Sequence, residues 1–204
     1  MRALPDLSLY LVIGPGDVPG RSLNDVVRDA VRGGVTAVQL RRKQGSTRAF
    51  IEDARALLAV LRPVGIPLII NDRVDVALAV DADGAHVGQD DMDVEDARRL
   101  LGPHCLIGVS VTNLAEARHA DGTSADYLGI GPVFTTATKP DAAPALGLAA
   151  TAEICRGTRI PSVAIGGINQ NNAADVRATG VCGLAVVSAI CAAPDPAAAA
   201  ASLR

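Results

Sequence analysis

Hydrophobic and polar positions follow one two-part pattern along the chain. A short run rich in Val, Ile and Leu is followed by a segment in which Ala and Leu recur at the spacing of a helix with one buried face. The pattern occurs eight times, as expected for parallel strands that alternate with helices. The predicted strands are Leu9–Ile13, Ala37–Leu40, Leu68–Ile70, Ala85–Val87, Leu106–Val109, Tyr127–Ile130, Ser162–Ile165 and Gly183–Val187.

The predicted helices follow these strands. Ser22 is a suitable N-cap for the first of them. The final Ala-rich run is interpreted as a helix and not as a linker, because Ala has the highest helix propensity. The predicted helices are Leu23–Arg32, Thr47–Leu61, Val74–Val80, Val94–Leu101, Leu114–Ala120, Leu148–Arg156, Ala173–Ala178 and Pro196–Leu203.

Eight such units in about 200 residues indicate an α/β protein whose fold is a (β/α)₈ TIM barrel. We expect a single catalytic domain over residues 1–204, because no internal boundary interrupts the pattern. An open doubly wound sheet is the alternative. It is disfavoured because Gly14-Pro15-Gly16 lacks the third spaced glycine of a dinucleotide-binding loop.

Composition and charge narrow the class of protein. Hydrophobic residues make up 49% of the 204 residues and aromatic residues 2%, so Val, Leu, Ile and Ala must form the core. The net charge is −3 without a basic block, which argues against nucleic acid and membrane partners. The four cysteines form no CxxC pair. No apolar run is long enough for a membrane span or signal segment, and we expect a cytoplasmic protein.

Acidic residues follow two neighbouring predicted strands. Asn71 and Asp72 come directly after one strand, and Asp91 follows the next. Adjacent parallel strands lie roughly 4.8 Å apart, so these carboxylates could share one Mg²⁺ with oxygen ligands at about 2.1 Å. Asp72 could instead cap the helix from Val74. Asp93 is better placed than Asp91 to cap the next helix, and the pair therefore favours a metal over capping.

Four further strand ends carry groups suited to anions. Arg41-Arg42-Lys43 follows a predicted strand, a position that favours phosphate binding over an exposed charged surface. The segment from Gly131 to Lys139 is long and polar, which indicates a lid with Thr hydroxyls and a lysine. Gly167 and Val187-Ser188 lie where TIM barrels commonly bind phosphate. Ser110 has no His or acid at its own strand end, so a Ser-His-Asp hydrolase is unsupported.

These residues belong to a set of motifs in one order along almost the whole chain. With them, the sequence resembles the thiamine-phosphate synthase family, also called thiamine-phosphate pyrophosphorylase. The motifs are Leu9-Tyr10-Leu11-Val12, Val38-Gln39-Leu40-Arg41 with Lys43, Ile70-Asn71-Asp72-Arg73, His86-Val87-Gly88-Gln89 with Asp91-Met92, Ile107-Gly108-Val109-Ser110, Tyr127-Leu128-Gly129-Ile130-Gly131-Pro132-Val133-Phe134, Thr136 with Thr138-Lys139, Ala164-Ile165-Gly166-Gly167-Ile168 and Val186-Val187-Ser188.

The resemblance implies a transferase of thiamine biosynthesis. It would condense hydroxymethylpyrimidine diphosphate with hydroxyethylthiazole phosphate to give thiamine phosphate and pyrophosphate, by a dissociative mechanism assisted by Mg²⁺. The metal ligands would be Asp72 and Asp91, and the catalytic residues Lys139, Ser110, Arg41 and Lys43. The pyrimidine diphosphate would contact Gln39, Leu40, Arg41, Arg42, Lys43, Asn71, Ser110 and Lys139. The thiazole phosphate would contact Thr136, Ala137, Thr138, Gly167, Val187 and Ser188.

The chain departs from the family pattern at a few positions. Ile13-Gly14 stands where Thr-Asp is common, Arg42 where an acid is common, Asp93 where Pro is common and Thr135 where Pro is frequent. Ile13-Gly14 could alter the floor of the site, and Thr135 could loosen the lid. None of these changes removes a proposed ligand side chain.

Other interpretations stay open at this point. A thiazole tautomerase-like relative would share the barrel but need a catalytic His near the site. A sugar-phosphate isomerase or decarboxylase would need an acid and a base across the barrel mouth. A catalytically silent phosphate-binding barrel would bind ligands without turnover. The partners in each case are small phosphorylated molecules, and the sequence leaves a homo-oligomer open.

Overall fold

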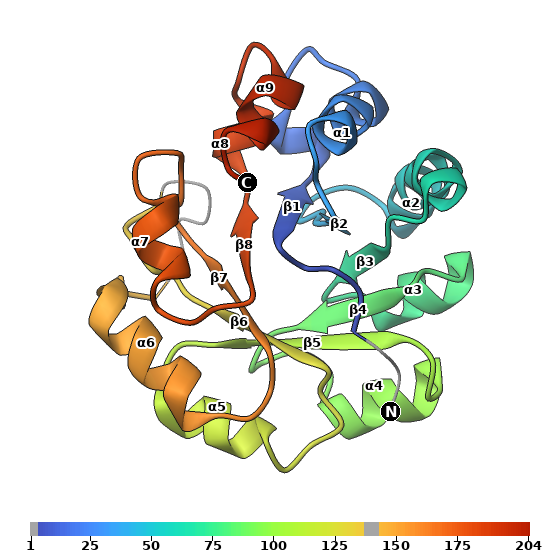
Figure 1. Cartoon of the computed structure of the whole chain (residues 1–204). Helices are drawn as coiled ribbons and strands as arrows, with labels where there is room; N and C mark the ends of the chain where they lie inside the picture. Colours follow the sequence, from blue (N-terminus) through green and yellow to red (C-terminus); the bar gives the residue numbers. More distant parts are fainter. Residues whose placement is uncertain (1–3, 137–142) are drawn as a thin grey trace.

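The computed structural model describes residues 4–136 and 143–204. Within these ranges, eight parallel strands pair in sequence order and close into one barrel (Figure 1), which confirms the predicted fold. The strands are β1 Leu9–Ile13, β2 Ala37–Leu40, β3 Leu68–Asn71, β4 Gly84–Val87, β5 Leu106–Val111, β6 Tyr127–Ile130, β7 Ser162–Ile165 and β8 Gly183–Val186.

Helices surround the barrel (Figure 1). The first five predicted helices have their predicted bounds. The later ones differ by one or two residues, and the short helix α8 was not predicted. The helices are α1 Leu23–Arg32, α2 Thr47–Leu61, α3 Val74–Val80, α4 Val94–Leu101, α5 Leu114–Ala120, α6 Gly147–Gly157, α7 Ala173–Arg177, α8 Ser188–Cys191 and α9 Pro196–Ala201, with 3₁₀ turns η1 Pro15–Asp17 and η2 Arg62–Val64.

Except for β4, each strand contributes apolar side chains to two separate layers of the core. In β1, Leu9, Leu11 and Ile13 pack outward against the helices, whereas Tyr10 and Val12 belong to the barrel interior. This alternation is the two-residue period of a strand. Branched aliphatic side chains dominate both layers, as the composition predicts.

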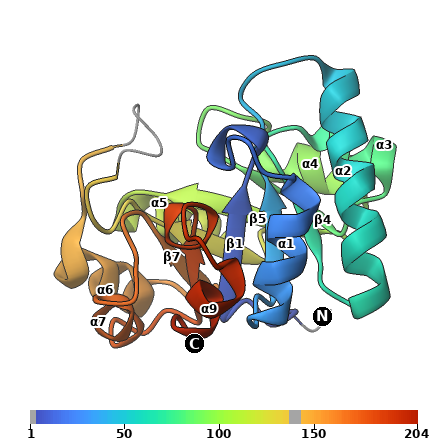
Figure 2. The ribbon, with the colours of Figure 1, turned by 90° about the horizontal axis from the view of Figure 1, so that it is seen from above.

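The two ends of the chain complete the outer ring. Helix α1 packs against α9 and against α2 (Figures 1 and 2). The predicted cap of α1 is confirmed, because the Ser22 side chain accepts a hydrogen bond from the Asp25 amide. In the described part of the chain, no helix has the length and apolar character needed to cross a membrane.

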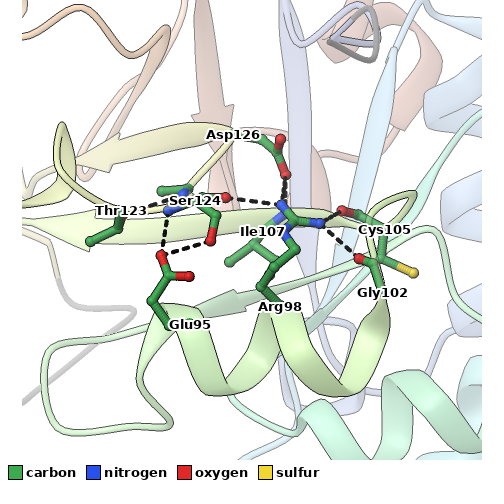
Figure 3. A network of polar contacts seen from close by, with 9 residues as sticks. Glu95, Arg98, Gly102, Cys105, Ile107, Thr123, Ser124 and Asp126 are labelled. Carbon is green, nitrogen blue, oxygen red and sulfur yellow. Dashed lines mark hydrogen bonds and ion pairs between the residues drawn. The ribbon is translucent and has the colours of Figure 1, made fainter.

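Arg98 of α4 joins the loops at the N-terminal end of the barrel (Figure 3). Its Nη1 donates to the carbonyl oxygens of Gly102, at 3.0 Å, and Cys105, at 2.6 Å. Its Nη2 donates to the carbonyl of Ser124 at 2.9 Å and to Oδ2 of Asp126 at 2.6 Å. This arginine therefore stabilises the barrel at the end opposite the C-terminal strand ends.

Candidate active site

A cavity of about 470 Å³ opens at the C-terminal ends of the strands. This volume lies in the range of small-molecule sites, and the position is where TIM barrels carry their active sites. Its wall includes most residues that the sequence singled out. They lie on β2, β3 and β5, in the segments that follow β2, β3, β4, β6, β7 and β8, and at the start of α8. These residues are Gln39, Arg41, Lys43, Asn71, Asp72, Asp91, Ser110, Thr136, Gly167, Val187 and Ser188.

Some of the expected contact residues lie elsewhere. Leu40 is fully buried in the core and does not line the cavity. Arg42 forms an ion pair with Asp53 of α2 and donates to the Gln44 carbonyl at 2.9 Å, so its guanidinium is engaged outside the cavity. Ala137, Thr138 and Lys139 lie outside the described residues.

The structure removes the capping role considered for Asp72. The N-cap of α3 is Arg73, without a side-chain capping bond. Asp72 has a φ of 61°, a left-handed conformation that Asp and Asn adopt more readily than most residues. Its amide donates to the carbonyl of His86 at 2.8 Å, and its Oδ2 accepts from Nζ of Lys43 at 2.8 Å. The carboxylate thus faces the cavity beside a cation.

Asp91 closes its own loop and approaches Asp72. Its Oδ2 accepts from the Gly88 amide at 2.7 Å, a structural contact that sequence reasoning did not give it. Asp93, in contrast, caps α4 as predicted by accepting from the Glu95 amide. Burial raises the pKa of the Asp91 carboxyl, and the adjacent Asp72 carboxylate raises it further, against the lowering by the Gly88 amide.

Two carboxylates that lie this close together suit a shared cation. Among the described residues, no group of three or more His, Cys, Asp and Glu side chains could hold a metal ion. Mg²⁺ commonly takes one or two protein carboxylates and completes its shell with water and substrate phosphate oxygens. Asp72 and Asp91 fit that pattern.

The Ile13-Gly14 departure has a local explanation. A Cβ built on Gly14 would lie 2.0 Å from the carbonyl oxygen of Arg41, so only glycine fits there. The Gly14 amide donates to Oδ2 of Asp17 at 2.8 Å. Burial raises the pKa of Asp17, whereas the Gly14 amide and the Arg41 guanidinium lower it. Asp17 therefore places a carboxylate close to Arg41.

Backbone turns after β6 and β7 form the side of the cavity opposite Lys43 and Asp72. Gly166 and Gly167 have φ values of 106° and 66°. A Cβ on Gly167 would lie 2.8 Å from Cβ of Phe134 and 2.9 Å from the carbonyl oxygen of Thr135. The Phe134 amide donates to the Gly166 carbonyl at 3.0 Å. These contacts hold the segment that leads to Thr136 against the end of β7.

A hydrogen-bonded series of polar side chains crosses the barrel interior at the wall of the cavity. Gln39 donates to Tyr10 at 3.0 Å, and the hydroxyls of Tyr10 and Tyr127 are 2.9 Å apart. His86 contacts Tyr127 through Nδ1 at 3.0 Å and Ser110 through Nε2 at 2.9 Å. Burial lowers the pKa of His86 to about 4, so its imidazole is neutral at pH 7.

The sequence predicted only part of this hydrogen-bonded series of side chains. As expected for an imidazole within the predicted strand Ala85–Val87, His86 is buried and hydrogen-bonded. The roles of Tyr10 and Tyr127 were missed. The available signal was that both tyrosines of the chain occupy strand positions in a sequence with 2% aromatic residues.

Comparison with known proteins identifies the family. Residues 9–190 match the family model described as thiamine monophosphate synthase. The thiamine-phosphate synthase of Chloroflexus aurantiacus is 57% identical over 199 residues, which cover 98% of this chain and 92% of that protein. That of Albidiferax ferrireducens is 53% identical over 201 residues, with coverage of 98% and 92%.

A solved structure agrees with these relatives. The thiamine phosphate pyrophosphorylase from Pyrococcus furiosus superposes with a TM-score of 0.88 at 42% identity, covering 97% of this chain and 94% of that one. Among the described residues, each motif that carries the resemblance contributes at least one residue to the cavity wall. The chain belongs to the thiamine-phosphate synthase family.

Proposed function

We propose that this cavity carries out the reaction of the family, in which hydroxymethylpyrimidine diphosphate and hydroxyethylthiazole phosphate give thiamine phosphate and pyrophosphate. The observation that supports this site is that one cavity joins two different anion-binding ends. Cations and carboxylates line one end, and glycine turns with Thr136 and Ser188 line the other. Two phosphorylated small molecules can therefore meet in one enclosed space.

The diphosphate is assigned to the end formed by β2, β3 and the loop after β4. Arg41 and Lys43 supply positive charge to the departing pyrophosphate, and Arg can bind two phosphate oxygens at once. Gln39, Asn71 and Ser110 supply polar contacts to the pyrimidine diphosphate from the same wall. Lys139, outside the described residues, is proposed as an additional cation for this end.

Asp72 and Asp91 are the proposed Mg²⁺ ligands. When bound there, Mg²⁺ supplies Lewis-acid stabilisation of negative charge on the diphosphate. The Lys43 ammonium already balances the Asp72 carboxylate at 2.8 Å. Asp91 stays oriented toward the same region through its contact with the Gly88 amide.

The bond changes need positioning and charge stabilisation. The bond between the pyrimidine methylene carbon and the diphosphate oxygen breaks first, and its electron pair leaves with pyrophosphate. The electron-rich aminopyrimidine stabilises the resulting carbocation, and the lone pair of the thiazole nitrogen forms the new carbon–nitrogen bond. No proton is transferred, so the residues act by positioning and electrostatics.

The thiazole phosphate is assigned to the opposite end. Thr136, Gly167, Val187 and Ser188 line it, with Ala137 and Thr138 proposed from the sequence alone. Residues at the ends of β7 and β8 form the usual phosphate site of TIM barrels. This arrangement would point the thiazole ring toward the pyrimidine.

Several broader predictions accompany this assignment. A cytoplasmic location and one catalytic domain over residues 1–204 stay predictions. Assembly into a homo-oligomer also stays open. Small phosphorylated molecules are the substrates that the family membership supports.

The direct test is a product assay. The purified protein is incubated with both substrates and Mg²⁺, and thiamine phosphate and pyrophosphate are quantified. We expect equal amounts of the two products, and no thiamine phosphate when either substrate is omitted. Lys139→Ala should lower turnover by about a hundredfold or more. Folded protein that forms no product would support a silent binding barrel instead.

A further inference from the structure

The buried chain of polar side chains has one member that can only donate at its contact. Gln39 reaches Tyr10 through its amide nitrogen Nε2, at 3.0 Å. An amide NH₂ has no acceptor capacity. The Tyr10 oxygen must therefore accept, and the hydroxyl proton of Tyr10 has to go elsewhere.

Counting protons favours one direction for the following bonds. The hydroxyl of Tyr10 lies 2.9 Å from that of Tyr127 and can donate to it. Tyr127 can then donate its own proton to Nδ1 of His86, at 3.0 Å. An imidazole that accepts at Nδ1 carries its proton on Nε2, and Nε2 lies 2.9 Å from Oγ of Ser110.

The barrel leaves space for this contact at two glycines. A Cβ on Gly108 of β5 would lie 2.4 Å from Nδ1 of His86 and 2.5 Å from the Tyr127 hydroxyl. A Cβ on Gly129 of β6 would lie 2.9 Å from Cε1 of His86. Any larger residue at Gly108 would occupy the position of the Tyr127–His86 hydrogen bond. Glycine at these two positions therefore leaves room for the hydrogen-bonded side chains of His86 and Tyr127.

We propose that these hydrogen bonds all run from Gln39 to Ser110, and that His86 is a positioning residue that makes the Ser110 hydroxyl a donor toward the cavity. Ser110 accepts from Nε2–H of His86, which leaves its own proton to point at a ligand. Its target would be an acceptor atom of the pyrimidine diphosphate, an assignment that rests on the proposed function. The direction of the bonds does not depend on that assignment.

The direction can be measured without any substrate. Protein labelled with ¹⁵N-histidine shows by long-range proton–nitrogen correlation which imidazole nitrogen carries hydrogen, and His86→Asn assigns the signals. We expect one neutral tautomer of His86 at pH 7, with Nε2 protonated and Nδ1 not. The opposite tautomer, a mixture of both, or a doubly protonated ring would overturn the proposal.

Conservative variants test what the direction does. Tyr10→Phe and Tyr127→Phe each keep the ring and remove one hydroxyl from the series of hydrogen bonds. Because the direction of the bonds is then no longer imposed on the imidazole, His86 should show both tautomers. The KM for the pyrimidine diphosphate should then rise about fivefold, as expected for one misdirected hydrogen bond, with the KM for the thiazole phosphate unchanged. Thr151→Val removes a buried hydroxyl of α6 that is not part of the hydrogen-bonded series from Gln39 to Ser110. It should change neither the tautomer of His86 nor the KM for the pyrimidine diphosphate.

The two measurements separate the possible failures. A fixed Nε2–H tautomer in the wild type together with an unchanged KM in Tyr127→Phe would support the direction of the bonds and overturn the substrate-facing role of Ser110. An unchanged single tautomer of His86 in both tyrosine variants would overturn the claim that the hydrogen bonds from Gln39 through the two tyrosines set that tautomer.

Discussion

Lys43 and Asp72 form an ion pair across the ends of β2 and β3, with 2.8 Å between Nζ and Oδ2. The two side chains are 51% and 25% exposed. Ion pairs in such surroundings contribute little to stability, so a ligand can separate them at small cost. The Lys43 ammonium is thus available to a diphosphate and the Asp72 carboxylate to its metal. Until a ligand binds, each charge neutralises the other.

The adjacent arginines should differ in function. Arg41 lines the cavity, whereas Arg42 pairs with Asp53. Arg41→Ala should raise the KM for the pyrimidine diphosphate about tenfold or more, because a charge-assisted contact to phosphate is lost. Arg42→Ala should leave that KM within about twofold. Steady-state kinetics with the diphosphate varied decides this, and equal effects of both substitutions would contradict the site geometry.

Gly167 should affect the other substrate. Gly167→Ala forces a Cβ toward Phe134 and the Thr135 carbonyl, which displaces the segment leading to Thr136. The KM for the thiazole phosphate should rise about tenfold, and stability should fall by about 1 kcal/mol from the positive φ. Gly65→Ala is the matched control, since Gly65 has a φ of 69° and open space around its Cβ position. It should show the stability loss alone.

Arg98 should govern stability and not catalysis. Its side chain is 17% exposed and bonds four acceptors at the N-terminal end of the barrel (Figure 3). Arg98→Ala removes the ion pair with Asp126, which keeps only the Ile107 amide as a donor, and three contacts to carbonyl oxygens. The free energy of unfolding should therefore fall by about 3 kcal/mol. Arg99→Ala, at a 74% exposed side chain, should change it by less than about 0.5 kcal/mol. Urea denaturation measures the free energy of unfolding of both variants. Equal losses in the two would contradict the stabilising role of Arg98.

His86 should make stability depend on pH below neutrality. Its pKa in the folded protein is about 4, against an ordinary value of 6.5, because burial disfavours the charged ring. Between these values the unfolded chain binds the extra proton, so stability is unaffected above pH 6.5 and decreases as pH falls toward 4. The total is roughly 3 kcal/mol at most. His86→Asn should flatten this part of the stability profile measured by denaturation, and an unchanged slope would refute the assignment.

Periodicity predicted most of the fold because the strands are buried on both faces and the helices on one. Leu9–Ile13 and Thr47–Leu61 keep their predicted bounds for that reason. Helix α8 was missed because Ser188–Cys191 is a single turn, too short for a periodic signal.

The site was predictable where the chemistry lies at a strand end. Asp72 and Lys43 fit this rule and meet in the cavity. Arg42 stands beside Arg41 in the sequence, yet its direction is set by Asp53 on α2, which no local pattern reveals. The Tyr10–Tyr127 contact joins strands 117 residues apart, and such pairings depend on barrel closure.

The most direct test of the central claim is the initial rate of thiamine phosphate formation, with both substrates and Mg²⁺, in two aspartate variants. Asp72→Asn keeps a residue that tolerates the left-handed conformation and removes the negative charge of the proposed metal ligand. Its rate should fall by about a hundredfold or more with folding intact. Asp93→Ala removes only the cap of α4 and should keep the rate while stability falls by about 1 kcal/mol. A wild-type rate in Asp72→Asn, or no product from the wild type, would contradict the account.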